Sequence, residues 1–473
     1  MKLLVNFVSD TNTILWSYIL IIMLIGLGLY FTIRTKFVQF RMFGEMVRLL
    51  GEGAKDEKKG VSSFQAFCIS TASRVGTGNL AGVALAITTG GPGAVFWMWL
   101  IAIIGSASAF VESTLAQIYK VKHGDTFRGG PAYYMEKGLN ARWMGITFAI
   151  LLSLSFGLAF NSVQANTISS ALNKSFGIDK TLIAIVLSII TAVIIFGGIK
   201  RVAKVAELMV PIMAGAYILI ALYIMITNLT EIPGVFVLIF ENAFGLKEVA
   251  GGTLGAAMMN GIKRGLFSNE AGMGSAPNAA AAADVTHPVK QGLIQALGVF
   301  VDTLVICSST AFIILLSGLY TSKESDGIIL TQNALETSIG EWAGIFLAFI
   351  VFLFAYSSVV GNYFYGESNI EFFSTSKLLL NLFRVAVVGM VAFGSIASLD
   401  FVWSLADLFM GLMAIINLIA ISLLGKIAFA ALADYKKQKA SGKNPVFHVS
   451  NIEGLKNVEA WSNASDKMEA DKN

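Results

Sequence analysis

The fold is decided by the stretch Thr71-Ala72-Ser73-Arg74-Val75-Gly76-Thr77-Gly78-Asn79-Leu80-Ala81-Gly82. It lies inside an apolar run, residues 61–90, that is long enough to cross a bilayer. Three glycines, an arginine and an asparagine nevertheless stand in its middle. Glycine costs about 1 kcal/mol in a helix interior, and an arginine at mid-bilayer costs roughly 2.5–3.5 kcal/mol on insertion scales. The pattern predicts a helix broken inside the membrane, with free backbone groups that can hold a solute or an ion.

A face of small residues for close helix packing is the alternative interpretation of this stretch. It accounts for Gly78 and Gly82, which are spaced as in a Gly-xxx-Gly seam. It gives no reason for Arg74 and Asn79 in the same run, so we favour the broken helix.

The composition places the whole chain in a membrane. Of its 473 residues, 55% are hydrophobic and only 14% are charged, whereas soluble proteins average about 25% charged residues. The net charge of +4 is not clustered in a domain that could bind nucleic acid. Cys68 and Cys307 both lie in apolar runs, so no disulfide framework is indicated. The three histidines show no metal-ligand spacing, and we expect no organic cofactor.

Hydropathy predicts an all-α integral membrane protein with eleven spans. They lie near residues 14–33, 62–90, 94–119, 143–172, 181–199, 205–228, 250–285, 290–318, 342–366, 377–396 and 402–430.

The basic residues predict the orientation of these spans. Segments 34–60, 120–142 and 200–204 carry seven, five and three Lys or Arg residues, whereas the alternate loops carry four in total. By the positive-inside rule the first set is cytoplasmic. The N-terminus is then outside, and the polar tail, which we expect to be mobile from about Ala440, is cytoplasmic.

The seventh span contains a second break. Gly272-x-Gly274 follows Gly76-x-Gly78 at an offset of 196 residues (272 − 76 = 196), and the same offset carries the starts of spans 3 to 6 onto those of spans 8 to 11 within about three residues. Five spans in each unit give the two units opposite topology. This is the leucine-transporter architecture, a five-helix inverted repeat, here with one extra N-terminal helix.

The predicted units are 1–60, the extra helix and a basic loop; 61–228, the first repeat; 229–435, the inverted repeat; and 436–473, the tail.

The breaks predict a site for a zwitterion and an ion. Half-helix N-termini suit a carboxylate, which we assign to Gly76, Thr77 and Gly78, while Asn79 offers its side-chain oxygen to Na⁺. Carbonyl groups near Ser268 and Asn269 would accept from the ammonium group. The complete predicted substrate set is Ser73, Gly76, Thr77, Gly78, Asn161, Gln164, Ser268, Asn269, Met273 and Gly274.

Two further pairs of polar residues stand in apolar helices. Ser357 and Ser358 could complete a second Na⁺ site with the carbonyl of Val75, or could simply bond carbonyls of their own helix. Asn161 and Gln164 are three residues apart and share a helix face. They could line one cavity, or could form ordinary interhelical hydrogen bonds.

The repeat pairs Arg74 with Glu270, because both stand two residues before a Gly-x-Gly. Buried charges need partners, so we predict an Arg74–Glu270 ion pair that joins the two broken helices. In the competing interpretation Arg74 binds the substrate carboxylate directly. Glu112, within the third span, is the alternative counter-ion.

The two breaks and their surroundings resemble the sodium:alanine/glycine symporter family of amino acid carrier proteins. The resemblance rests on the runs 75–84, 90–99 and 265–277 and covers about residues 14–435. It implies Na⁺-coupled uptake of a small amino acid across the plasma membrane of a prokaryote. The run that contains Asn79 also resembles the first helix of the leucine transporter, where this asparagine is a Na⁺ ligand. Ser357 and Ser358 match the paired hydroxyls of its eighth helix by type and context.

An enzyme, a channel and a sensor are the functions that compete with a transporter. A membrane enzyme would need a Ser/His pair or His-x-x-x-His on the spans, and no histidine lies in one. A channel filter is not recognisable. A non-transporting sensor remains an alternative. Within the transporter interpretation, alanine, glycine, serine and glutamine are all candidate substrates, and proton coupling through Glu270 is the alternative to Na⁺.

Overall fold

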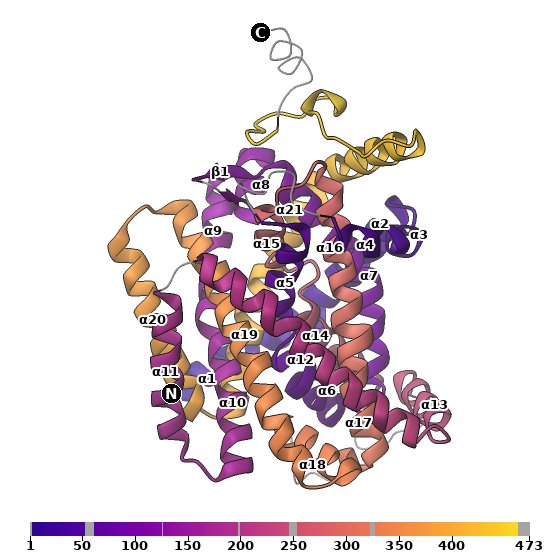
Figure 1. Cartoon of the computed structure of the whole chain (residues 1–473), viewed down its shortest axis with the longest axis vertical. Coiled ribbons are helices and arrows are strands. Elements are labelled where there is room, and N and C mark those ends of the chain that lie inside the picture. The colour runs from indigo at the N-terminus through magenta and orange to yellow at the C-terminus, as the bar shows by residue number, and fades with distance from the viewer. Residues whose placement is uncertain are drawn as a thin grey trace.

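The structure, a computed structural model, is a helical bundle (Figure 1). It describes residues 2–52, 61–124, 126–196, 199–245, 253–321 and 327–461, with only the backbone for 2–4 and 199–210. The predicted loop residues Lys55, Lys58, Lys59, Lys247 and Lys323 lie outside these ranges. Within them, the one sheet is an antiparallel pair, β1 (Val121–His123) and β2 (Thr126–Arg128), with Val121 opposite Arg128.

Helices occupy each of the predicted spans. Continuous or interrupted helices in chain order are α1 (Lys2–Ile14), η1 (Leu15–Leu20) and α2 (Ile21–Arg34); α5 (Ser63–Arg74), η2 (Gly78–Gly82) and α6 (Val83–Gly90); α7 (Ala94–Ile118); α9 (Arg142–Leu152), η3 (Ser153–Phe160) and α10 (Asn161–Phe176); α11 (Lys180–Ile195); α12 (Ile199–Thr227); α14 (Leu254–Asn269) and α15 (Ala276–Ala282); α16 (Pro288–Val299), η4 (Phe300–Cys307) and α17 (Ser308–Ser317); α19 (Trp342–Phe373); α20 (Lys377–Ile396); and α21 (Leu399–Ala440). Among the described residues, seven helical segments are long and apolar enough to cross a membrane by themselves.

Several predicted loops also contain helices. These are α3 (Val38–Arg41), α4 (Phe43–Leu50), α8 (Pro131–Leu139), α13 (Ile232–Ala243), η5 (Leu319–Thr321), α18 (Gly327–Ile339) and η6 (Val449–Asn451). The chain turns by 102° between α12 and α13. In Figure 1 α13 and α18 lie at the end of the bundle opposite to β1 and α8. Hydropathy missed α13 because its twelve residues are too few to span a bilayer.

The first break falls where the sequence predicts it. A capping box between Ser62 and Gln65 starts α5, and the helix ends at Arg74 because Val75 has ψ 87°. The chain becomes helical again at Gly78, through the π-helical turn η2 that leads into α6.

The second break separates α14 from α15. Glu270 has left-handed backbone angles, with φ 56°, and Gly272 and Gly274 have φ 85° and 89°. Glycine adopts this conformation freely, whereas it costs a residue such as glutamate about 1 kcal/mol or more. Helix α15 restarts with Pro277 in its first turn, where proline is well tolerated.

The cytoplasmic ends of the two broken helices, named from the predicted orientation, are joined by their backbones. Val61, just before α5, donates its N–H to the carbonyl of Ala282 at 3.4 Å and accepts from the N–H of Asp284 at 3.0 Å. Helix α7 packs along α14 and α16, while α12 and α19 pack against α5. The two breaks are thereby held side by side in the middle of the bundle.

The C-terminal segment 441–461 is not the solvated tail that its polarity predicts. It packs across one end of the bundle, with Phe447 and Ile452 buried. The N–H of Phe447 donates to the carbonyl of Thr286 at 2.9 Å, and the indole of Trp461 donates to the carbonyl of Gln117 at 2.8 Å. Tertiary packing of a few apolar side chains outweighs the polar composition here. Residues 462–473 lie outside the described residues.

Replacing Phe447 with alanine should release this segment. Truncating a buried phenylalanine costs about 3–5 kcal/mol, and 3 kcal/mol raises the open population roughly 100-fold. We expect faster trypsin cleavage at Lys443 and Lys456, followed by mass spectrometry. Glu453→Ala, at an exposed position of the same segment, is the control. Equal cleavage rates in the two variants would show that Phe447 does not hold the segment.

Candidate functional site

The two breaks touch at Gly78. A Cβ at this position would lie 3.0 Å from the ring of Phe267 and 3.0 Å from the Cα of Ser268. Only glycine allows η2 to approach the end of α14 so closely. The predicted site residues of the two breaks therefore come together.

Gln164 contacts the first break from α10. Its Oε1 accepts from the backbone N–H of Thr77 at 3.0 Å and from the Thr77 hydroxyl at 2.5 Å. The sequence leaves Gln164 either lining a cavity or forming an interhelical hydrogen bond. The structure shows an interhelical bond, and its partner is the break itself. The free N–H of a broken helix here binds a side-chain oxygen.

Asn79 joins the first break to a carboxylate that the sequence analysis missed. Its Oδ1 accepts from the N–H of Gly76 at 2.9 Å, and its Nδ2 donates to Asp302 Oδ1 at 2.6 Å. Asp302 Oδ2 also accepts from the hydroxyls of Ser268 and Thr303, both at 2.8 Å. An acid inside the apolar run of η4 was the available signal, because carboxylates within a membrane are rare and usually functional.

Ser357 and Ser358 reach the end of α5. Their hydroxyls lie 3.3 Å and 3.0 Å from the carbonyl oxygen of Ala72, and both also bond the carbonyl of Phe354 in their own helix. The bonds within their own helix are therefore present, and the Na⁺ site with the Val75 carbonyl stays a prediction. Ser358 Oγ fills the space that a Cβ on Gly76 would need, and Val75 is buried beside it.

The structure does not contain the predicted Arg74–Glu270 ion pair. Arg74 points to α16, where its Nη1 donates to the carbonyl of Gln295 at 3.3 Å and where a Cβ on Gly298 would collide with it. The neighbouring Ser73 faces Glu270 instead, with 2.8 Å between Oγ and Oε1. Successive residues of a helix point about 100° apart, so only one of the two can face the second break.

Glu112, the alternative counter-ion for Arg74, forms its hydrogen bonds at the second break and not with Arg74. It accepts from the N–H of Gly272 at 3.1 Å and from Asn417 Nδ2 at 2.8 Å. Among the described residues, the Nε and Nη2 atoms of Arg74 have no hydrogen-bond partner.

The remaining predicted residues divide into two groups. Asn161 bonds Asn362 near Ser73, and Asn269 bonds the N–H of Ala271 while its buried Nδ2 has no partner in the described chain. Gly274 lies elsewhere, since a Cβ there would meet Phe148, Asn417 and Pro131. Met273 is buried in the same turn. Among the described residues, no contact places Met273 or Gly274 beside Gly78.

An aromatic layer covers the breaks on the side predicted to be extracellular. The rings of Phe160 and Phe267 are 4.5 Å apart, and those of Phe267 and Trp403 are 4.6 Å apart. Arg264 lies 4.4 Å above the Trp403 ring and forms a 2.5 Å ion pair with Asp407. Phe267 and Trp403 also lie against Gly78 and Gly82 of the first break.

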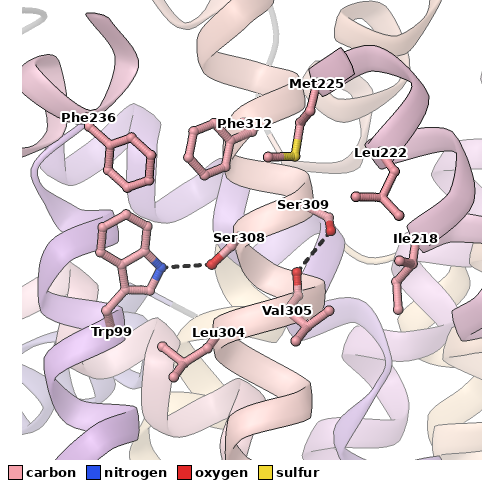
Figure 2. A pocket seen from close by; sticks show the side chains of 10 residues that line it. All are labelled: Trp99, Ile218, Leu222, Met225, Phe236, Leu304, Val305, Ser308, Ser309 and Phe312. Carbon is pink, nitrogen blue, oxygen red and sulfur yellow. Dashed lines mark hydrogen bonds between the residues drawn. The ribbon is translucent and has the colours of Figure 1, made fainter. Parts of the chain in front are cut away.

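A separate cavity of about 380 Å³ lies between α7, α12, α13 and the η4–α17 helix (Figure 2). Figure 2 shows its two hydroxyls already bonded: Ser308 to the indole of Trp99 at 2.8 Å, and Ser309 to the carbonyl of Val305 at 2.9 Å. Its other lining side chains are apolar. It contains none of the predicted site residues and offers little to a zwitterion.

Two interrupted helices that bring buried polar groups together inside an apolar bundle are typical of membrane transporters. The chain belongs to the sodium:alanine symporter family, whose model matches residues 1–449. It is a transporter and not an enzyme. The amino-acid carrier protein AlsT of Bacillus subtilis is 60% identical over 99% of this chain and 98% of its own length. The probable sodium/glutamine symporter GlnT of the same organism is 56% identical over 97% and 96%.

A solved structure supports the fold alone. A manganese transporter of Eremococcus coleocola has a TM-score of 0.51 at 13% identity, over 83% of this chain and 93% of that one.

Replacing Gly76 with alanine should place a methyl group on Ser358 Oγ. Overpacking of this kind costs about 1–3 kcal/mol of unfolding free energy, and the double variant Gly76→Ala/Ser358→Gly should recover part of the loss. Thermal unfolding in detergent measures both. Gly389→Ala is the control, because nothing lies within 4 Å of a Cβ there. A double variant no more stable than the single one would contradict the collision.

Proposed function

We propose that this chain imports a small neutral amino acid of the alanine and glycine class, coupled to Na⁺ by alternating access. One observation carries the proposal: in a chain of this family, the backbone N–H and the hydroxyl of Thr77 both donate to the side-chain oxygen of Gln164. An amide oxygen is the same kind of acceptor as a carboxylate oxygen. This contact supports a substrate carboxylate binding the broken helix at the position of the Gln164 oxygen.

Two more groups suit the ends of a zwitterion. The buried Nδ2 of Asn269 has no partner in the described chain and is available to a carboxylate oxygen. Asp302 lies between the two breaks and accepts three hydrogen bonds, out of about four that a carboxylate can take. The remaining acceptor site suits the substrate ammonium group. This extends the sequence-based proposal, which relied on carbonyls near Ser268 and Asn269.

The close contact at Gly78 favours a small side chain. Phe267 and Ser268 already lie against this glycine, and the rings of Phe160 and Trp403 continue the layer. Alanine and glycine need the least space beyond their carboxylate and ammonium groups. Glutamine is the second candidate, because a relative that is 56% identical is named a probable sodium/glutamine symporter. Serine remains within the size range.

Neutral oxygens favour Na⁺ as the coupling ion. Ser357 and Ser358 meet the carbonyl of Ala72 at the end of α5, next to Val75. Asn79 Oδ1 accepts one hydrogen bond and has a second lone pair for a cation. Proton coupling is the alternative.

The proposed topology keeps eleven transmembrane helices, with repeats at 61–228 and 229–435 and one extra N-terminal helix. Both repeats begin with a broken helix, which supports an inverted pair. The N-terminus and the Arg264–Asp407 pair are then on the outside, and segment 441–461 is on the cytoplasmic side. A multi-pass protein of this family belongs in the plasma membrane of a prokaryote.

Uptake into proteoliposomes tests the proposal. We expect labelled alanine or glycine to accumulate under an inward Na⁺ gradient, with serine and glutamine as competitors in the same panel, and Asn79→Ala to abolish accumulation. Binding without uptake would identify a sensor. Uptake that ignores Na⁺ but collapses with a protonophore would overturn Na⁺ coupling.

Removing one hydroxyl should weaken Na⁺ binding selectively. Ser358→Ala loses one cation ligand, and a contact worth about 1.4 kcal/mol corresponds to a tenfold higher half-saturating Na⁺ concentration. Ser309→Ala is the matched control, because within the described part of the chain its hydroxyl bonds the carbonyl of Val305 in its own helix. The readout is the Na⁺ dependence of alanine uptake. Equal Na⁺ curves for the two variants would remove Ser358 from the site.

A further inference from the structure

A chain of hydrogen bonds leads from η3 to the second break. Asn161 Nδ2 donates to the carbonyl of Gly157 at 3.0 Å, and Asn362 Nδ2 donates to Asn161 Oδ1 at 3.1 Å. Asn362 Oδ1 then lies 2.8 Å from Ser73 Oγ, which lies 2.8 Å from Glu270 Oε1. All five residues are buried.

The donor and the acceptor of every hydrogen bond in this chain follow from the contact with the Gly157 carbonyl. A backbone carbonyl can only accept, so the amide of Asn161 must turn its nitrogen to Gly157 and its oxygen to Asn362. Asn362 must then present its oxygen to Ser73. A serine hydroxyl has a single proton, and Ser73 has to give it to Asn362. The contact between Ser73 and Glu270 therefore joins two oxygens, and its proton can come only from Glu270.

The contacts of the second carboxyl oxygen of Glu270 also fit a protonated, neutral side chain. Its Oε2 accepts one hydrogen bond, from the hydroxyl of Ser275 at 2.6 Å. The nearby charged or titratable side chains come from four elements: Arg74 of α5, Glu112 of α7, Asp302 of η4 and Tyr365 of α19. Among the described residues none forms an ion pair with Glu270. An ionised carboxylate would be poorly compensated here, and burial disfavours the charged form.

Asp302 provides an internal contrast. The N–H of Gly76 can only donate, so Asn79 turns its oxygen to Gly76 and its nitrogen to Asp302. Ser268 and Thr303 add two more donors to the same carboxylate. Asp302 is thus surrounded by donors, as an ionised carboxylate requires, whereas Glu270 faces an oxygen that has no proton left to give.

We propose that Glu270 is a proton-binding site, a carboxylic acid in this conformation that donates to Ser73 and so links α5 to the second break. Separation of the two breaks would break this bond. The acid can then pass its proton to water, which leaves a carboxylate and a hydronium ion. The site thereby makes transport pH-dependent, and this inference rests on the proposed transport function. An oxygen–oxygen distance of 2.8 Å is that of an O–H···O hydrogen bond, so a proton accounts for the contact without a metal ion.

Infrared spectroscopy of the purified full chain tests the protonation directly. We expect the wild type to show the carbonyl stretch of a buried carboxylic acid, Glu270→Gln to lose it and Asp302→Asn to keep it. A wild type without this band, or a band that survives in Glu270→Gln, would overturn the proposal. This readout needs no transport, so it stands apart from a failure of the proposed function.

Transport of alanine into proteoliposomes tests the consequence. The amide of Glu270→Gln can donate to Ser73 and accept from Ser275, so this variant should transport, but its rate should not change with pH, whereas the wild-type rate should fall several-fold as pH rises. A pH profile that is unchanged in Glu270→Gln would contradict the proposal. So would a loss of one bound Na⁺ per protein in that variant, measured with ²²Na⁺, because the oxygens would then hold a metal ion.

Discussion

Backbone N–H groups freed at the two helix breaks have to find partners inside an apolar bundle, and the rest of the structure depends on this requirement. Four of these N–H groups donate to a side-chain oxygen. Gly76 is bound by Asn79, Thr77 by Gln164, Ala271 by Asn269 and Gly272 by Glu112. Two partners belong to the same break and two come from the flanking helices α7 and α10. In the proposed function a substrate carboxylate competes for these donors, so the same groups would stabilise the fold and select the substrate.

The breaks themselves could be predicted from the sequence, because glycines and buried charges have a known cost inside an apolar run. Which side chain faces which helix could not. Ser73 and Arg74 are neighbours, yet Ser73 faces Glu270 and Arg74 lies under Gly298 of α16. The Arg74–Glu270 pair was predicted from equivalent positions in the two repeats. Such a comparison does not say in which direction around its helix each side chain points. Asp302 was missed for a related reason: nothing in its spacing connects it to Asn79, and only the packing of η4 against η2 does.

Hydropathy located the long helices but not the elements that close the ends of the bundle. Helix α13 is too short to register as a span, and segment 441–461 carries its buried Phe447 and Ile452 without any helical or strand period. Such contacts depend on the surface that the segment covers, here the loop at Thr286 and the end of α7 at Gln117. Composition describes the segment alone and says nothing about that surface.

The two hydrogen bonds between Val61 and the end of α15 join backbone groups, at Ala282 and Asp284. Most substitutions at these three positions would therefore leave both hydrogen bonds in place. Proline is the exception at 61 or 284, since it has no N–H to donate. Because the backbone makes both bonds, sequence variation at these positions has little effect on them.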